Sequence, residues 1–221
     1  MTDRFVLGPD SEAPSVDWLQ SVLEDNDFHP MPHASDSDAW REIAARPWVS
    51  EQVPDWLESA RREAERSLGI IPASAYLAYA EENTRDPYMD ASRMRVRGLH
   101  LLMLAECLEG QGEFMRPMLD WSWALAEETS WVMSAHVDHW QEDPLPDVHR
   151  PGFDLRTAAV ATALAQLLYL FRPQMDEISG NWALRVEAAL DSQCVGFFLE
   201  NECHWQHMKN NWNSVCHAGV V

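Results

Sequence analysis

The sequence predicts an all-α fold, and three observations carry that prediction. Apolar residues recur every three or four positions along most of the chain, as they do on the core-facing side of a helix. Residues that cap or stop helices stand between these apolar stretches. No hairpin signal and no alternating strand of convincing length interrupts the pattern. The expected helices follow one another in pairs, joined by loops of a few to about twenty residues, which favours a helical array or toroid over a compact four-helix bundle.

The sequence pattern predicts an N-terminal helical segment over residues 1–72. Ser15 is a suitable N-cap for a first amphipathic helix. A second short helix contains Trp40 and stops at Pro47. A third has Pro54 near its first turn, where a helix tolerates proline best.

Residues 73–221 predict longer helices, of which the last begins near Asn213. Asp154 is a good N-cap for a segment rich in Ala and Leu, whose apolar residues on nearly every side are typical of a helix buried between others. Pro173 is expected to end that helix. The helices expected before the last cover Tyr76–Ala80, Asp90–Glu109, Met118–Glu128, Leu155–Phe171 and Trp182–Leu199.

The charge balance excludes several classes of partner. The chain has 36 Asp and Glu against 16 Lys and Arg, a formal net charge of −20, and most of these acidic residues are expected on solvated helix faces. Nucleic-acid binding needs a basic surface that displaces counterions from phosphates, so we expect no nucleic-acid partner and no binding to an anionic membrane. No apolar run approaches the ~18 residues of a membrane span. Met1–Pro14 lacks the basic start and apolar core of a secretory signal, so we expect a cytoplasmic protein.

Cofactor and metal motifs are missing from the sequence. The four Cys show no Cys-x-x-Cys spacing and are expected as free thiols, and the eleven Trp are expected mainly in the core. His136 and His139 are three residues apart, as are His204 and His207, but nothing supplies the further ligands that zinc would need. There is also no Gly-rich phosphate loop, nucleophile elbow or dinucleotide fingerprint, so we expect neither a metal nor a cofactor.

A first candidate cluster covers residues 127–136 and precedes a long polar loop, Asp138–Pro151. A helix that ends in Trp131 and His136 beside such a loop could line a cleft, because long ordered loops often carry function. The alternative is a helix C-terminus at which His136 only satisfies a carbonyl or the helix dipole.

A second candidate cluster covers residues 203–213, where His207, Trp212 and Asn213 lead into a helix N-terminus. Such a terminus offers backbone N–H donors and a partial positive charge, which suit an anionic ligand such as a carboxylate. The alternative is that Asn211 or Asn213 only caps the helix.

Residues 127–136 (EETSWVMSAH) and 210–219 (NNWNSVCHAG) form a pair of motifs. Together they resemble the helical domain of heparinase II/III-like proteins, a group that includes oligo-alginate lyases and related uronate-polysaccharide lyases. Leu104–Gly110 and Leu145–Asp147, with Asp154 and Leu155 downstream, also match. The resemblance covers roughly residues 73–221.

The resemblance implies an incomplete (α/α) toroid, part of a lyase that acts by β-elimination beside a uronic acid. By position, Asn211 matches the residue that neutralises the substrate carboxylate, and His217 or His136 matches a substrate-facing imidazole. Trp131, His207, Trp212 and Asn213 are then expected to bind an acidic oligosaccharide. The catalytic Tyr and a further His are expected beyond Val221, because the helix begun near Asn213 stops without a cap and the chain reads as truncated.

Two other functions stay open at this stage. One is a non-catalytic helical module for carbohydrate binding or assembly. The other is an inverting glycosidase on a similar toroid, which would need two carboxylates that converge on one bond. A cut toroid would expose apolar helix faces, so we also expect self-association into a homo-oligomer.

Overall fold

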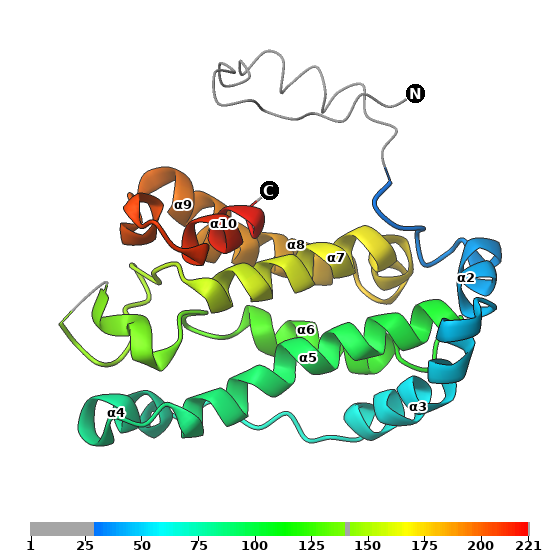
Figure 1. Ribbon diagram of the computed structural model, residues 1–221, viewed down its shortest axis with the longest axis horizontal. Helices are drawn as coiled ribbons and strands as arrows, with labels where there is room; N and C mark the ends of the chain where they lie inside the picture. The colour runs from blue at the N-terminus through cyan, green and yellow to red at the C-terminus, as the bar shows by residue number, and fades with distance from the viewer. Residues whose placement is uncertain (1–28, 140–141, 221) are drawn as a thin grey trace, which may run out of the picture. The chain divides into compact units, whose positions relative to one another are not determined.

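A computed structural model describes residues 29–139 and 142–220 of the protein. The helix expected after Ser15 lies outside the described residues. Contacts divide the chain into two units, Met1–Met31 and Pro32–Val221, and of the first only residues 29–31 are described. Figure 1 shows the helices of the second unit.

The described residues are mostly helical (71%) and contain no β-strand, which confirms the all-α prediction. A π-helical turn, η2, occupies Asp191–Val195, and short 3₁₀ helices occupy Ser134–His139 (η1) and His204–His207 (η3). The α-helices are α2 (Ser37–Ala44), α3 (Pro47–Ala64), α4 (Ala73–Glu82), α5 (Asp86–Glu109), α6 (Met115–Ala126), α7 (Leu155–Ile178), α8 (Gly180–Leu190), α9 (Gly196–Glu200) and α10 (Asn211–Ala218).

The N-terminal helices differ from the prediction at Pro54. Pro47, expected to stop the helix before it, opens α3, while Pro54 lies in the interior of that helix and not in its first turn. The side chain of Asp36 caps α2 by accepting from the backbone N–H of Ala39. α3 packs against α5, so helices on both sides of the boundary expected between residues 72 and 73 contact each other.

A close approach joins α5 and α6. Gly98 lies in the middle of α5, and a Cβ atom placed there would fall 2.1 Å from Cζ3 of Trp121 in α6. The turn between these helices is held by Glu106, whose buried carboxylate accepts from the backbone N–H groups of Gly112 and Phe114 at 2.6 and 2.9 Å. The position of Trp121 therefore depends on the absence of a side chain at residue 98.

Helix α7 is the central buried helix, as expected, and contacts α5, α6, α8 and α10 (Figure 1). Asp154 caps it in a reciprocal capping box with Thr157, which confirms the predicted start. The prediction that Pro173 ends α7 is wrong, because the helix continues to Ile178.

The structure shows how α7 accommodates Pro173. Proline has no N–H, so the carbonyl of Tyr169, four residues earlier, loses its helical donor. Nδ1 of His33 supplies that donor from outside the helix, 2.9 Å from the Tyr169 oxygen, and the backbone N–H of Ala34 bonds the carbonyl of Leu170 at 3.2 Å. The His33 ring also stacks on Tyr169, with 4.4 Å between ring centroids.

The single helix expected over Trp182–Leu199 is interrupted. The π-helical turn η2 separates α8 from α9, and α9 ends at Glu200. In the described part of the chain, no helix combines the length and the apolar character needed to cross a membrane.

Candidate functional site

The segment after α6 forms an irregular turn, not the helix end that was expected. α6 stops at Ala126, residues 127–133 have no regular structure, and η1 follows at Ser134. The backbone carbonyl of Glu128 accepts from Nε2 of Gln193 at 2.8 Å, and the hydroxyl of Ser130 donates to the carbonyl of Pro151 at 2.7 Å. The turn therefore follows a path set by contacts from distant elements.

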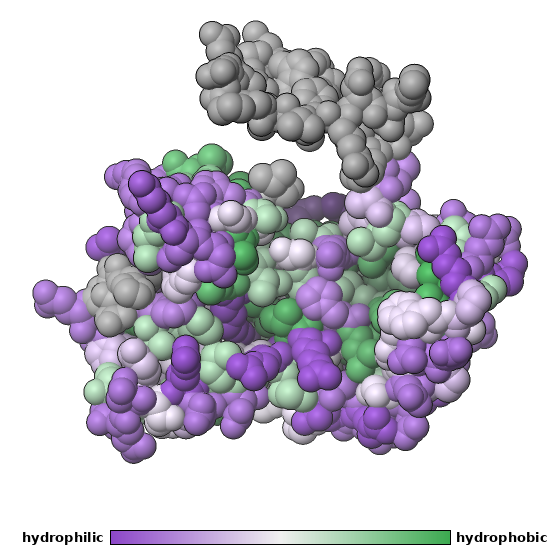
Figure 2. Space-filling view, in the orientation of Figure 1, coloured by the Kyte–Doolittle hydropathy of each residue, from purple (hydrophilic) through white to green (hydrophobic). Residues whose placement is uncertain are grey.

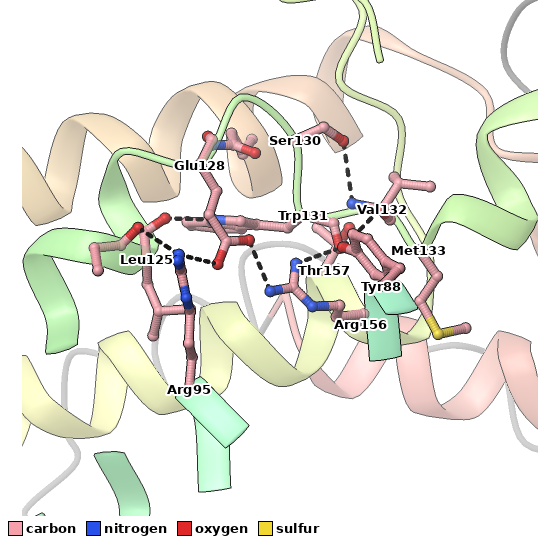
Figure 3. A network of polar contacts seen from close by, with 12 residues as sticks. Tyr88, Arg95, Leu125, Glu128, Ser130, Trp131, Val132, Met133, Arg156 and Thr157 are labelled. Carbon is pink, nitrogen blue, oxygen red and sulfur yellow. Dashed lines mark hydrogen bonds and ion pairs between the residues drawn. The ribbon is translucent and has the colours of Figure 1, made fainter. Parts of the chain in front are cut away.

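A buried ion-pair network anchors this turn (Figure 3). The Glu128 carboxylate lies between two guanidinium groups, with one oxygen 2.9 Å from Arg95 of α5 and the other 2.7 Å from Arg156 of α7. All three side chains are less than 10% exposed. Arg95 also donates to the carbonyls of Gly69 and Ala124, and Arg156 to the carbonyl of Trp131 at 3.0 Å. Each buried charge thus has a counter-charge or polar partners, as burial demands.

Two buried tyrosines complete the network. The hydroxyl of Tyr88 donates to the carbonyl of Val132 at 3.0 Å, and the hydroxyl of Tyr76 donates to the carbonyl of Ser130 at 3.4 Å. Burial raises the pKa of Tyr76 to about 12 and the pKa of Tyr88 well above its ordinary value. Burial lowers the pKa of Arg156, but Tyr88 and Glu128 outweigh it, so the net pKa is raised and Arg156 stays charged.

Asp154 links the end of the turn to α7. One of its oxygens accepts from the backbone N–H groups of Arg156 and Thr157, as the helix cap. The other accepts from the backbone N–H of Met133 at 3.0 Å and from Nδ1 of His136 at 2.7 Å. Because a carboxylate only accepts, Nδ1 carries a proton, and in neutral His136 the lone pair belongs to Nε2. This is the arrangement by which a carboxylate orients a catalytic imidazole.

The two segments that carry the family resemblance meet at His136. Its ring lies 4.7 Å from that of Trp212 in α10, with an angle of 59° between the ring planes. The His204 ring lies 5.6 Å from Trp212. α10 can sit this close to α7 because Gly219, at its C-terminus, has no side chain: a Cβ atom there would fall 2.6 Å from Cα of Ala158.

The start of α10 leaves the exposed amide of Asn211 without a hydrogen bond within the described residues. The cap is Asn210, whose side-chain oxygen accepts from the backbone N–H of Trp212 at 3.1 Å, so the alternative in which Asn211 or Asn213 caps the helix is wrong. Asn213 instead donates through Nδ2 to the carbonyl of Gln206 at 2.7 Å. Asn211 is exposed, and its amide makes no hydrogen bond within the described residues.

His217 is held on the same helix. Its Nδ1 donates to the carbonyl of Asn213 at 2.7 Å, which again places the lone pair of the neutral ring on Nε2. Trp205 and Phe198 pack edge-on against the ring, with centroid distances of 5.1 and 5.6 Å. The ring is thus fixed in orientation and partly accessible.

Two predicted binding residues lie elsewhere. Trp131 is 0% exposed, and its Nε1 donates to the carbonyl of Leu125, so it belongs to the core and offers no face to a ligand. His207 is exposed, with Nε2 2.5 Å from a carboxylate oxygen of Glu202.

A cavity of about 530 Å³ borders the other side of the turn, and none of the predicted site residues lines it. Its polar lining comes mainly from the turn itself and from Arg95. The lining residues are Leu68, Gly69, Ile70, Ile71, Ala73, Tyr76, Arg95, Ala124, Glu127, Glu128, Thr129, Leu145 and Pro146.

The four cysteines are buried free thiols, as expected. Burial raises the pKa of Cys194 to about 11, and the pKa values of Cys107, Cys203 and Cys216 to about 12. Over residues 29–139 and 142–220, no group of three or more His, Cys, Asp or Glu side chains is arranged to hold a metal ion.

Sequence reasoning missed the charged residues that build the site. The side chains of Glu128 and Asp154 are buried, whereas most acidic residues were expected on solvated faces, and Asp154 was recognised only as a cap. The positions of Glu128 and Asp154 inside or beside the quoted motifs were the available signal. Comparison with models of known protein families and with curated proteins finds no match to this chain.

Proposed function

We propose that this chain belongs to a uronate-oligosaccharide lyase of the heparinase II/III-like type, with its helical hairpins arranged as part of an (α/α) toroid. The observation that carries the proposal is the contact between His136 and Trp212 at 4.7 Å. Residues 127–136 and 210–219 resemble that group as a pair, and a shared site requires them to meet in space. A chance likeness of two separate segments would not require it.

The exposed residues near this contact suit the recognition of a uronate carboxylate. Asn211 offers a neutral amide donor at the first residue of α10, where the helix N-terminus adds a partial positive charge. In the proposal its N–H stabilises the charge that develops on the carboxylate as the C5 proton leaves. Trp212 packs against the rings of His136 and His204, and the carbonyl of Asn213 accepts from Nδ1 of His217.

The elimination breaks the C5–H and C4–O4 bonds and forms a C4=C5 double bond. A base takes the C5 proton, and an acid protonates the departing O4. Tyr76 and Tyr88 are unsuited to this transfer, because both are buried, bonded to carbonyls and raised in pKa. In the proposal His136, oriented by Asp154, and His217 face the substrate.

Short acidic oligosaccharides in the cytoplasm are the proposed substrates. A net charge of −20 repels a long polyanion, and salt screens that repulsion beyond about 8 Å at physiological ionic strength. A short oligosaccharide brings few charges close to this surface. Electrostatic repulsion therefore weakens its binding at the Asn211 donor less than it weakens the binding of a long polymer.

The test is absorbance near 232 nm, which reports the unsaturated uronate, together with calorimetric binding. This chain, and the longer product where the reading frame continues, are titrated with alginate, heparin, hyaluronan and chondroitin oligosaccharides. Asn211→Ala should lower the affinity or rate at least about tenfold, the value of one charge-assisted hydrogen bond. The matched control is Asn181→Ala, which removes an exposed amide from the first turn of α8 and should change nothing.

Each outcome decides between the functions. Absorbance that depends on Asn211 supports the lyase. Binding without absorbance from either chain favours a non-catalytic carbohydrate-binding module. Cleavage without absorbance, lost on removal of an Asp or Glu and kept in Asn211→Ala, identifies a glycosidase. No binding of any uronate oligosaccharide overturns the proposal.

A further inference from the structure

A second hollow, of about 390 Å³, lies between α5 and α7, and none of Asn211, His136 and His217 lines it. Its volume falls in the range of small-molecule pockets, which are mostly apolar with a few well-placed polar groups. The residues that line it are Met89, Ser92, Arg93, Val96, Arg97, His100, Met133, Arg156 and Ala159. Figure 2 shows hydrophobic residues gathered on this face between α5 and α7, with hydrophilic residues around them.

The arginines at this hollow are left without carboxylate partners. Arg93 and Arg97 are exposed one turn apart on α5, and within the described residues neither makes an ion pair or hydrogen bond. Some exposed arginines of this acidic chain pair with carboxylates, as Arg61 does with Glu113 and Arg172 with Glu187, whereas in the described part of the chain the apolar hollow is lined by two that do not. Two guanidinium groups without partners, four residues apart on one helix and lining one hollow, suit an external carboxylate.

Two further groups favour an anion here. Ser92, next to Arg93 on the same helix, is 0% exposed, and within the described residues its Oγ has no hydrogen-bond partner. A buried hydroxyl without a partner is rare in folded proteins and marks a place where a ligand or water can bond. Arg156 also lines the hollow, and because it shares Glu128 with Arg95 the buried network carries one net positive charge.

We propose that this hollow binds a small amphipathic carboxylate. The carboxylate head lies on the guanidinium groups of Arg93 and Arg97, within reach of the Ser92 hydroxyl. The apolar body lies against Met89, Val96 and Met133. A sugar acid fits poorly, since the hydroxyl groups of its ring would face these apolar side chains without partners.

The probe is octanoate, titrated by calorimetry at low salt, with two comparison ligands. Acetate keeps the head without the body, and octylamine keeps the body with the opposite charge, so both should bind at least about tenfold more weakly. Added salt should weaken octanoate binding, because the arginines are exposed.

Two variants separate the head site from the body site. Arg93→Gln combined with Arg97→Gln should lower octanoate affinity at least about tenfold, while Arg116→Gln, an exposed arginine of α6 away from the hollow, should leave it unchanged. Ala159→Leu keeps both arginines and fills the space for the body, so it should also weaken binding. All these positions are exposed, and thermal melting checks that the variants stay folded.

Three results would overturn the proposal: no octanoate binding at millimolar concentration, equal binding of octylamine, or full affinity in the double Arg variant. A uronate oligosaccharide that competes with octanoate would also overturn it, because the two ligands would then share one site. The inference stands apart from the proposed lyase function, since octanoate binding should be unaffected in Asn211→Ala.

Discussion

At the scale of single residues, the buried carboxylates of Asp154 and Glu128 have different structural roles. Asp154 ends one helix and orients one imidazole with the same side chain, so the cap of α7 and the position of His136 cannot vary independently. Glu128 instead holds a turn that has no regular hydrogen bonding of its own. Both side chains are buried, and each has partners in more than one element of the fold.

Removing the charge of Glu128 should be strongly destabilising. Glu128→Gln leaves two buried guanidinium groups without a counter-charge, which typically costs about 3–5 kcal/mol. Urea unfolding followed by circular dichroism measures the change in the free energy of unfolding. Glu127→Gln, on the exposed neighbour, is the matched control and should stay within about 0.5 kcal/mol. Equal effects of the two substitutions would mean that the network contributes nothing specific.

A side chain at residue 98 should also destabilise the protein. Gly98→Ala places a methyl group that overlaps the Trp121 ring, which is 2% exposed. We expect a loss of about 1–3 kcal/mol. Gly180→Ala, where a Cβ would meet nothing within 4 Å, is the control. A gain in stability from Gly98→Ala, as helix propensity alone predicts, would show that α5 and α6 can move apart.

At the scale of elements, the bond from His33 to α7 should couple to Pro173. His33→Ala removes the donor to the Tyr169 carbonyl and should cost about 0.5–1.5 kcal/mol. In a Pro173→Ala background the new backbone N–H of residue 173 can bond the Tyr169 carbonyl. His33→Ala should therefore lower the free energy of unfolding by less in that background. Ring stacking on Tyr169 is lost in both backgrounds and cancels in the double-mutant cycle.

The measurement is the coupling energy from four urea-unfolding curves: the original chain, the two single variants and the double variant. A coupling of about 0.5 kcal/mol or more is expected. Strict additivity would show that Tyr169 gains nothing from His33, and that α7 tolerates an unbonded carbonyl.

The same elements show how far the sequence could predict the fold. The start of α7 was predictable, because Asp154 and Thr157 lie three residues apart and form the cap locally. Its end was not, since the donor that compensates for Pro173 lies 136 residues from Tyr169. A local rule about proline cannot include a donor from so far away.

The candidate site divides in the same way. Sequence motifs indicated the two segments that meet at His136 and Trp212. They did not indicate that Trp131 is core or that Glu128 is buried, because both depend on partners in α5, α6 and α7. Residue types in a motif predict which chemistry is available, and only the packing decides which side chains reach the surface.

At the scale of the whole molecule, stability should fall steeply above pH 9. The buried thiols have pKa values of about 11 to 12 in the folded protein, against an ordinary value of 9.0. Above pH 9 the unfolded chain loses these protons first, so it binds fewer protons than the folded protein and is favoured as pH rises. The stabilising contribution is complete below pH 9 and is lost between pH 9 and 12, by up to about 1.4 kcal/mol per pH unit for each thiol.

Urea unfolding at pH 8, 9, 10 and 11 measures this dependence. Cys107→Ala removes one titrating group and should flatten the curve above pH 9, whatever it does to stability at pH 8. A slope unchanged by the substitution would show that the thiol ionises in the folded protein as readily as in the unfolded chain.

The carbonyls of Tyr169 and Leu170 accept hydrogen bonds from His33 and Ala34, which lie outside α7, so the full length of α7 depends on residues that are not part of the helix. A peptide of residues 155–178 contains every atom of the helix but lacks both outside donors. In isolation such a peptide should lose helical order around Pro173, whatever length its own composition favours. The last turns of α7 are thus a property of tertiary contact, and any event that releases His33 would shorten the helix from a distance.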